Sequence, residues 1–220
     1  EAHKGLAMGE HQAMTALEWC IAREGEDELA ASSHQKMAAA YEEGFFDDLI
    51  TPFLGLERDN NLRADSTVEK LAKLKPAFGK GDARTMTAGN STPLTDGASC
   101  VLLASEEWAK ANGHEVLAYL TFQETAAVDF VEKKEGLLMA PAYAVPRMLE
   151  RAGIKLQDFD YYEIHEAFAS QVLSTLKAWE DPKFCKDRLG LDAPLGSIDR
   201  TKLNVKGSSL AAGHPFAATG

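Results

Sequence analysis

Apolar and polar residues follow helical spacing over several stretches of the chain. Residues 27–43 are Ala-rich with dispersed charges, which predicts a helix that ends at Gly44, a residue type common just after helix C-termini. Residues 65–78 open with a capping-box pattern in which a glutamate follows Ser66 by three positions, and Pro76 is expected to end this second helix. Further helices are predicted over 105–113, 140–153 and 167–179.

Short apolar runs lie between these helices and predict strands. Residues 98–104 form a continuous apolar run suited to a buried strand. A second strand is predicted over residues 115–126. Residues 158–164 are rich in aromatic side chains, which favours a third strand. Strands that alternate with helices are typical of an α/β fold with layered packing.

Composition and charge narrow the range of functions. The chain has 220 residues, 45% hydrophobic and 26% charged, with a net charge of −11 and no basic block. This charge disfavours binding to nucleic acid or an anionic membrane. No apolar run reaches the length of about eighteen residues that a membrane helix needs, and the N-terminus lacks the pattern of a signal peptide. We therefore expect a cytoplasmic protein, or one of the mitochondrial matrix if the source is a eukaryote.

Three cysteines are too few and too scattered for a disulfide framework or a zinc site, so reduced thiols are expected. The chain begins without Met and stops at a sequence typical of the first turn of a helix. We expect it to be a segment of a longer protein.

His165 and Glu166 lie where the third predicted strand meets a predicted helix. In α/β folds, ligands collect at the carboxyl ends of strands, so this junction is a candidate site. A zinc-protease helix would need a second histidine four residues on, where this chain has Ala169. The alternatives left open are an acid/base pair and a His165 ring that only caps the helix.

Residues 204–220 contain a second candidate motif. Gly207 and Gly213 permit close backbone approach, and Pro215 suits the first position of a helix, with His214 near its N-cap. A helix N-terminus disfavours imidazolium, so His214 is expected to stay neutral and able to take up a proton or donate a hydrogen bond. A purely structural Gly-His-Pro turn is the alternative.

Taken together, the two motifs resemble those of the thiolases. His165 to Phe168 match the Asn/His-Glu-Ala-Phe motif, and residues 213–215 with 218–220 match Gly-His-Pro followed by Ala-Thr-Gly. The segments 8–11, 71–78 and 87–98 also occur in the family's order. The resemblance covers essentially all of the chain and is nearest to the fatty-acid β-oxidation branch, which includes the β subunit of the trifunctional complex.

The resemblance implies the layered α/β/α/β/α thiolase fold, here partial. It implies a loop domain over 1–84, the end of the N-terminal thiolase domain over 85–112, and a truncated C-terminal domain over 113–220. The expected reaction is cleavage of 3-ketoacyl-CoA by coenzyme A, or the reverse Claisen condensation. Coenzyme A acts as substrate, with no metal or other cofactor, and expected partners are a homodimer or homotetramer and possible assembly with a hydratase/dehydrogenase α subunit.

The resemblance also implies roles for individual residues. His165 and His214 match oxyanion-hole positions, His214 also matches the base that deprotonates the nucleophilic cysteine, and Glu166 is expected to orient groups without moving protons. Met8 matches a residue at the acyl pocket. Coenzyme A contacts are expected from Arg63, Leu74, Ala77, Phe78, Ala88, Thr92, Ala167 and Phe168. For Leu74 and Phe78 the alternative is plain core packing, and for Arg63 it is a solvated surface charge.

The last expectations concern the three cysteines and the functions that compete with a thiolase. Cys20, Cys100 and Cys185 match no catalytic position, and Cys100 is expected to be core; the resemblance places both catalytic cysteines outside these 220 residues. Rival interpretations are a ketoacyl synthase, whose histidines occur in different sequence contexts, and a non-catalytic thiolase-fold carrier of acyl-CoA or sterol. The presence of both cysteines in the complete gene would separate a carrier from an enzyme.

Overall fold

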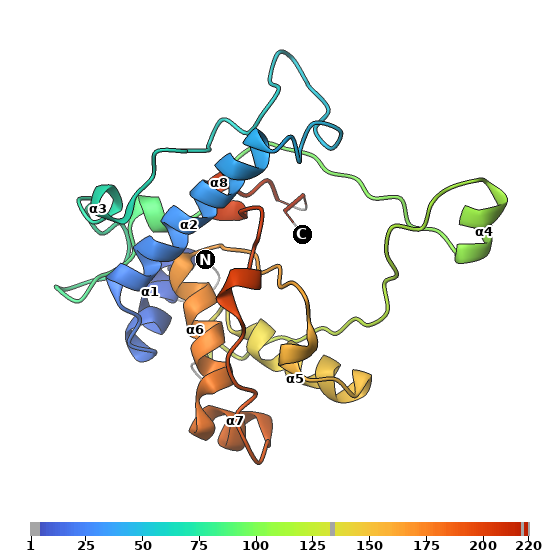
Figure 1. Cartoon of the computed structure of the whole chain (residues 1–220). Helices are drawn as coiled ribbons and strands as arrows, with labels where there is room; N and C mark the ends of the chain where they lie inside the picture. The colour runs from blue at the N-terminus through green and yellow to red at the C-terminus, as the bar shows by residue number, and fades with distance from the viewer. Residues whose placement is uncertain (1–4, 133–134, 217, 220) are drawn as a thin grey trace.

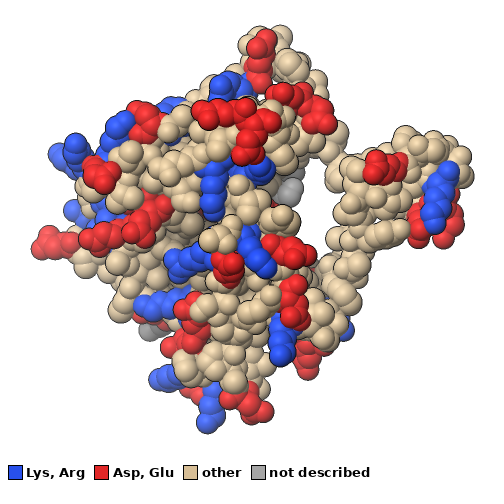
Figure 2. All heavy atoms as spheres, in the orientation of Figure 1, with Lys and Arg blue, Asp and Glu red and all other residues tan. Residues whose placement is uncertain are grey.

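Most helices gather in one body, from which a long excursion of chain departs. The structure, a computed structural model, describes residues 5–132, 135–216, 218 and 219. Figure 1 shows the excursion as the extended green chain that carries the short helix α4 (Glu106–Ala111) at its far end. On the face of the body drawn in Figure 2, acidic and basic side chains are interspersed.

Two long helices, α2 (Arg23–Glu42) and α6 (Ala169–Glu180), pack together at the centre of the body. The small side chains of Ala30 and Ala31 on α2 let the first residue of α6 and Leu210 of α8 (Ser209–Ala212) approach closely. Helix α1 (Met8–Glu18) packs on α6 from another side, so α6 is buried over almost its whole length.

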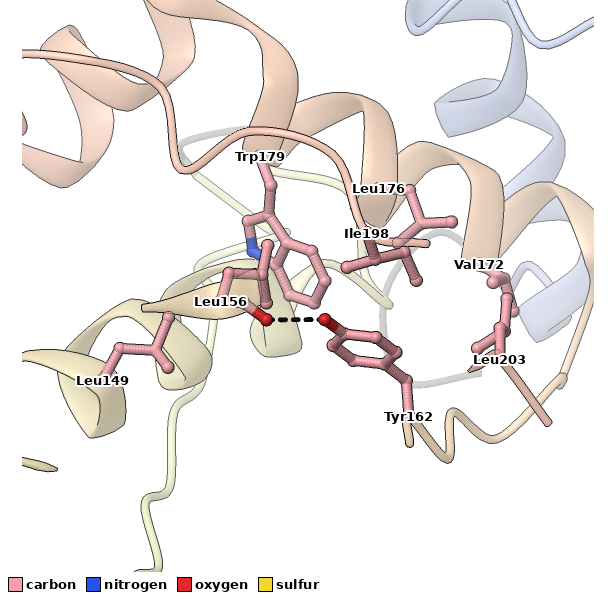
Figure 3. Close-up of a cluster of buried hydrophobic side chains, with 8 residues drawn as sticks. All are labelled: Leu149, Leu156, Tyr162, Val172, Leu176, Trp179, Ile198 and Leu203. Atoms are coloured by element: carbon pink, nitrogen blue, oxygen red, sulfur yellow. Dashed lines mark hydrogen bonds between the residues drawn. The ribbon is translucent and has the colours of Figure 1, made fainter. Parts of the chain in front are cut away.

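A second apolar core joins α6 to α5 (Ala140–Ala152) and to the irregular chain after it (Figure 3). Tyr162 lies within it, and its hydroxyl donates a hydrogen bond to the carbonyl of Leu156 at 2.7 Å. The backbone of Tyr162 bonds to the residues on both sides of Leu203, forming an isolated parallel bridge. This core therefore holds residues 160–164 beside residues 202–204. Its members are Leu149, Leu156, Tyr162, Val172, Leu176, Trp179, Ile198 and Leu203.

Four of the predicted helices are confirmed, as α2, α4, α5 and α6. Ser105 caps α4 by accepting a hydrogen bond from the backbone of Trp108, and Gly153 follows α5 with a left-handed φ of 67°. No sequence pattern predicts α7 (Pro182–Leu189) or α8. The described residues also contain the 3-10 turns η1 (Ala88–Asn90), η2 (Leu156–Asp158) and η3 (Arg200–Lys202).

The predicted helix over 65–78 is wrong in length and in its cap. Helix α3 spans only Val68–Leu71, and Thr67, not Ser66, accepts the capping hydrogen bond. Beyond it the chain turns away, so that Pro76 pairs with Thr87 as an isolated bridge. A longer helix would prevent this long-range pairing, which the local capping signal cannot anticipate.

None of the three predicted strand segments forms a ladder within the described part of the chain: 98–104 and 115–126 are extended (Figure 1), and 158–164 begins with the last residue of η2. Pairing there is confined to isolated bridges, none of which involves 98–104 or 115–126. Their apolar side chains are exposed as a result, with Leu102 70% and Leu117 88% accessible. The expectation that Cys100 is core is wrong in this structure, where its thiol is exposed. Across the described ranges, we find no helix with both the length and the apolar character required for a bilayer span.

Glu26 is a fully buried acid near the start of α2. One carboxylate oxygen accepts a hydrogen bond from the Thr85 hydroxyl at 2.6 Å, and the other has no hydrogen-bond partner among the described residues. Burial raises the pKa of Glu26 to about 7, and the neighbouring Asp27 carboxylate adds to that rise. Asp27 itself pairs with Arg23 and accepts from Asn90.

This raised pKa predicts that stability falls as pH rises from about 4.5 to about 7. Within that window the folded state holds a proton on Glu26 that the unfolded state has released. The stabilisation from this proton is therefore complete below the unfolded-state pKa of Glu26 and is lost above its folded-state pKa. Glu26→Gln should therefore stabilise the protein at pH 8 by up to about 3 kcal/mol and have little effect at pH 4. Urea unfolding at both pH values measures this; an equal effect at both would contradict it.

Candidate active site

Three segments that are distant in the sequence meet around the two histidine motifs. Residues 91–94 lie between the other two: the Thr92 N–H donates to the Ala167 carbonyl at 3.0 Å, and the Pro93 carbonyl accepts from the His214 N–H at 2.9 Å. Isolated bridges at Ser91 with Phe168 and at Leu94 with His214 extend these contacts. The predicted motifs therefore belong to one site.

The rings of His165 and His214 lie side by side, with centroids 4.4 Å apart and planes tilted by 39°. Both side chains are partly buried. The pKa of His165 is lowered, first by burial and then by the charge of His214. Because a proton on one ring disfavours a proton on the other, the neutral form of His165 is favoured at neutral pH.

The hydrogen bonds of Thr219 define the tautomer of neutral His214. The Thr219 hydroxyl donates its single hydrogen to the Pro215 carbonyl at 3.0 Å, so it accepts at its contact of 2.7 Å with His214 Nδ1. Nδ1 therefore carries the hydrogen, and Nε2 of the neutral ring keeps its lone pair. An imidazole in this state can take up a proton at Nε2 and then donate it back.

Glu166 is almost completely buried and joins three parts of the site. Its carboxylate accepts hydrogen bonds from the Ser33 hydroxyl at 2.7 Å, the Asn204 amide at 2.8 Å and the Leu210 N–H at 3.2 Å. Its own N–H donates to the Ser209 hydroxyl at 2.9 Å. Burial raises the pKa of Glu166, and the hydrogen bonds from Ser33, Asn204 and Leu210 oppose that rise.

Three residues of this network, Ser33, Asn204 and Ser209, are not predicted from the sequence. Asn204 and Ser209 stand inside the second motif, but no local feature assigns them a partner. Ser33 was hidden in an Ala-rich helix whose polar residues resemble a solvated face. A buried hydroxyl there would have been detectable only with knowledge of which face of α2 is packed.

The close backbone approach expected at the two glycines is present. Gly207 and Gly213 have left-handed φ values of 80° and 97°. A β-carbon on Gly207 would lie 2.6 Å from the Ser33 carbonyl, and one on Gly213 would lie 2.4 Å from the Thr95 side chain. Neither position can accept a larger residue without displacement of its neighbours.

The helix expected to start at Pro215 is not formed in the described residues. Helix α8 lies before His214 and ends at Ala212. After the histidine, the Ala218 N–H bonds to the Pro215 carbonyl in a tight turn. The ring of His214 is therefore held by Thr219, and the expected helix N-terminus is not the feature that sets its state.

Several of the residues expected to contact coenzyme A are linked through Phe168. The Phe78 ring packs edge-on against Phe168, with centroids 5.8 Å apart, and covers Gly9 closely enough to exclude a β-carbon there. Met8, half exposed, is the residue before that glycine. Ala77 bonds through its N–H to the Met86 carbonyl, Leu74 packs on Gly89, and Ala88 is exposed at the adjoining position.

Arg63 and Thr92 have local partners in this structure. The exposed Arg63 guanidinium donates to the carbonyls of Asn60 and Leu62. The Thr92 hydroxyl donates its hydrogen to the Ser209 carbonyl at 2.5 Å, so toward a ligand it can only accept. Within the residues described, no three His, Cys, Asp or Glu side chains gather in a way that could hold a metal ion.

Two adjacent imidazoles in this geometry are chemically able to transfer a proton and to donate hydrogen bonds to a developing oxyanion. Two family descriptions match the chain. The family described as "Thiolase, N-terminal domain" matches residues 1–107, and "Thiolase, C-terminal domain" matches residues 114–220. The chain belongs to the thiolase family.

Individual relatives agree with this assignment. The 3-ketoacyl-CoA thiolase of Shewanella loihica is 43% identical over all of this chain and 51% of its own length. The crystal structure of the Bacillus anthracis acetyl-CoA acetyltransferase is 38% identical, with a TM-score of 0.79 over 97% of this chain and 50% of that one. Human mitochondrial 3-ketoacyl-CoA thiolase in complex with CoA is 28% identical, with a TM-score of 0.77 over 100% of this chain and 51% of that one.

The chain spans about half the length of the relatives it matches. The similarity to these solved structures confirms the expected thiolase fold for the part that is present.

The lowered pKa of His165 can be tested without measuring activity. We expect the His165 ring to titrate below 6.5, and His214→Asn to raise its pKa only partly, because burial is the larger cause and remains. An NMR titration of the histidine rings measures both, with the exposed His114 ring as a reference signal. A His165 pKa that does not change in the variant would show that the two rings are electrostatically independent.

Proposed function

We propose that the protein is an acyl-CoA acyltransferase that cleaves 3-ketoacyl-CoA with coenzyme A into acetyl-CoA and a shortened acyl-CoA, or runs the reverse condensation. The observation that carries the proposal is the pair of rings 4.4 Å apart, of which His214 has a free Nε2. The names of the relatives, 3-ketoacyl-CoA thiolase and acetyl-CoA acetyltransferase, support it. Both histidines are assigned to catalysis.

In the proposed reaction His214 Nε2 takes the proton of a cysteine thiol that lies outside these 220 residues. The thiolate attacks the 3-keto carbon of the substrate, the bond to the neighbouring carbon breaks, and acetyl-CoA leaves as an enolate that takes a proton from the second cysteine, which also lies outside these 220 residues. Coenzyme A gives its thiol proton to that second cysteine and attacks the thioester, which releases the shortened acyl-CoA and returns the first cysteine as a thiolate. Ring N–H groups of His165 and of protonated His214 donate to the oxygen on which negative charge develops.

Coenzyme A is proposed to lie along the apolar surface that surrounds Phe168. The contacts of Phe78 with Phe168 and of Leu74 with Gly89 support this, as does the solved relative that contains CoA. Met8 is assigned to the acyl pocket, and Glu166 to orientation of the site. The remaining proposed contacts are Arg63, Ala77, Ala88, Thr92 and Ala167.

We also propose the domain arrangement expected from the sequence, with a loop domain over 1–84, the end of the N-terminal domain over 85–112 and the C-terminal domain over 113–220. The runs 98–104 and 115–126 are assigned to the sheets of the complete fold. Their exposed apolar side chains support this assignment, since a strand buried on both faces has such a composition. The cytoplasm or mitochondrial matrix is the proposed compartment.

The decisive test of the function is His214→Ala in the product of the complete gene. Turnover of acetoacetyl-CoA and coenzyme A should fall by a factor on the order of 10³, because one ring serves as base and as hydrogen-bond donor. His114→Ala, at an exposed ring on the excursion, is the matched control and should leave turnover unchanged. Activity of His214→Ala within threefold of wild type, with folding intact, would refute the role.

His165 should respond differently to substitution, because its proposed task is only to donate a hydrogen bond. Asn can supply a donor, partly through a bridging water, so His165→Asn should keep more activity than His165→Ala, in which turnover falls about 100-fold or more. The two variants are compared in kcat for thiolysis at fixed pH. Equal losses would mean that the ring acts by some means other than donation.

A further inference from the structure

Asn204 occupies a buried position with a left-handed backbone, directly before the loop that leads to His214. Only 2% of its surface is exposed, and its φ of 45° lies in the left-handed region, which glycine adopts freely and asparagine adopts more readily than most other residues. Its N–H donates to the Tyr162 carbonyl at 2.8 Å, and its carbonyl accepts from Gly207 at 2.9 Å. The backbone is therefore fixed before the side chain is considered.

The side-chain amide of Asn204 holds the residues on both sides of His165. Its oxygen accepts from the Ile164 N–H at 2.8 Å, and its nitrogen donates to the Ile164 carbonyl at 2.9 Å and to the Glu166 carboxylate at 2.8 Å. Both amide hydrogens are used in this way. One side chain thus fixes the chain immediately before and after the first histidine.

The same segment continues to the second histidine through contacts that are buried or partly buried. The Ser208 N–H donates to the Ser33 hydroxyl, which itself donates to Glu166, and the Leu210 N–H donates to the same carboxylate. His214 follows Leu210 by four residues. A shift of Asn204 relative to Glu166 would therefore change the separation of the two rings.

We propose that Asn204 is a positioning residue that sets the placement of His165 relative to His214. The proposal rests on the proposed function, because the placement matters for the reaction of that site. Asn204 does not touch the reacting atoms; it acts through Ile164 and Glu166. No shorter or longer side chain reproduces its three bonds, and aspartate, which has the same shape, lacks the two donors and sets a second carboxylate against Glu166.

The test compares Asn204→Asp with Asn112→Asp in the product of the complete gene. Asn112, on the exposed end of α4, receives the same change of charge and should behave as wild type. Asn204→Asp should lower kcat about 100-fold and change the KM for coenzyme A by less than about threefold, because misplacement of a catalytic group by about 1 Å costs that much. Activity should recover partly as pH falls, since a proton shared by the two carboxylates restores a hydrogen bond between them.

A second variant, Asn204→Gly, removes the amide without backbone strain and should show the same loss of kcat, without the recovery at low pH. A wild-type kcat in either folded variant would overturn the proposal. A rise in KM as large as the loss of kcat would also overturn it. Failure of both variants to fold would overturn it too, because the amide would then be required for the stability of the whole fold and not specifically for the geometry of the site.

A readout that does not need activity separates this proposal from the proposed function. Both variants should shift the NMR signals of the His165 and His214 rings and leave that of His114 in place; unchanged signals would overturn the proposal. A wild-type protein that fails to cleave acetoacetyl-CoA would refute the function alone, and the ring signals would still decide whether Asn204 positions the histidines.

Discussion

The site depends on the hydrogen bonds that the buried carboxylate of Glu166 accepts. A charge taken out of water is unfavourable unless hydrogen bonds replace its hydration, and here a hydroxyl of α2, an amide of residue 204 and a backbone N–H of α8 do so. Ser33 belongs to α2, whereas Asn204 and Leu210 both belong to the second histidine motif. Solvation of one acid therefore requires the central helix and both histidine motifs to come together, and the packing of small residues between α2 and α6 makes that approach sterically allowed.

The chemistry of His165 and His214 follows from the residues that surround their two rings. Thr219 bonds to Pro215 and so fixes which nitrogen of His214 carries the hydrogen, while the partly buried surroundings of His165 disfavour a charge there. Two identical side chains are in this way given different states by their neighbours. The arrangement leaves one ring ready to accept a proton and keeps the other neutral.

Local features that the sequence encodes directly were predictable from it. The helices α2, α5 and α6, the two histidines and the close approach at Gly207 and Gly213 depend on periodicity or on residue type, and each was expected from neighbouring residues. The short α3 was not, because the chain after it turns away to pair Pro76 with Thr87, which overrides local preference; the turn after Pro215 was expected as the start of a helix. The partners of Glu166 were likewise hidden, since Ser33 lies 133 positions away and only the tertiary fold shows which side of α2 is buried. Whether the expected coenzyme A contacts are correct stays a prediction.

The unpaired apolar runs bear on how this chain would behave at high concentration. Val101, Leu102, Leu103, Leu117 and Leu120 are all at least 70% exposed on backbone that is already extended. Such backbone presents N–H and C=O groups that are not part of a sheet, beside exposed apolar side chains. A strand from another molecule can therefore pair with it. The net charge of −11 opposes that contact through repulsion that salt screens. Solubility of the 220-residue chain is therefore a competition between charge repulsion and intermolecular β-sheet formation, and raising ionic strength shifts it toward aggregation.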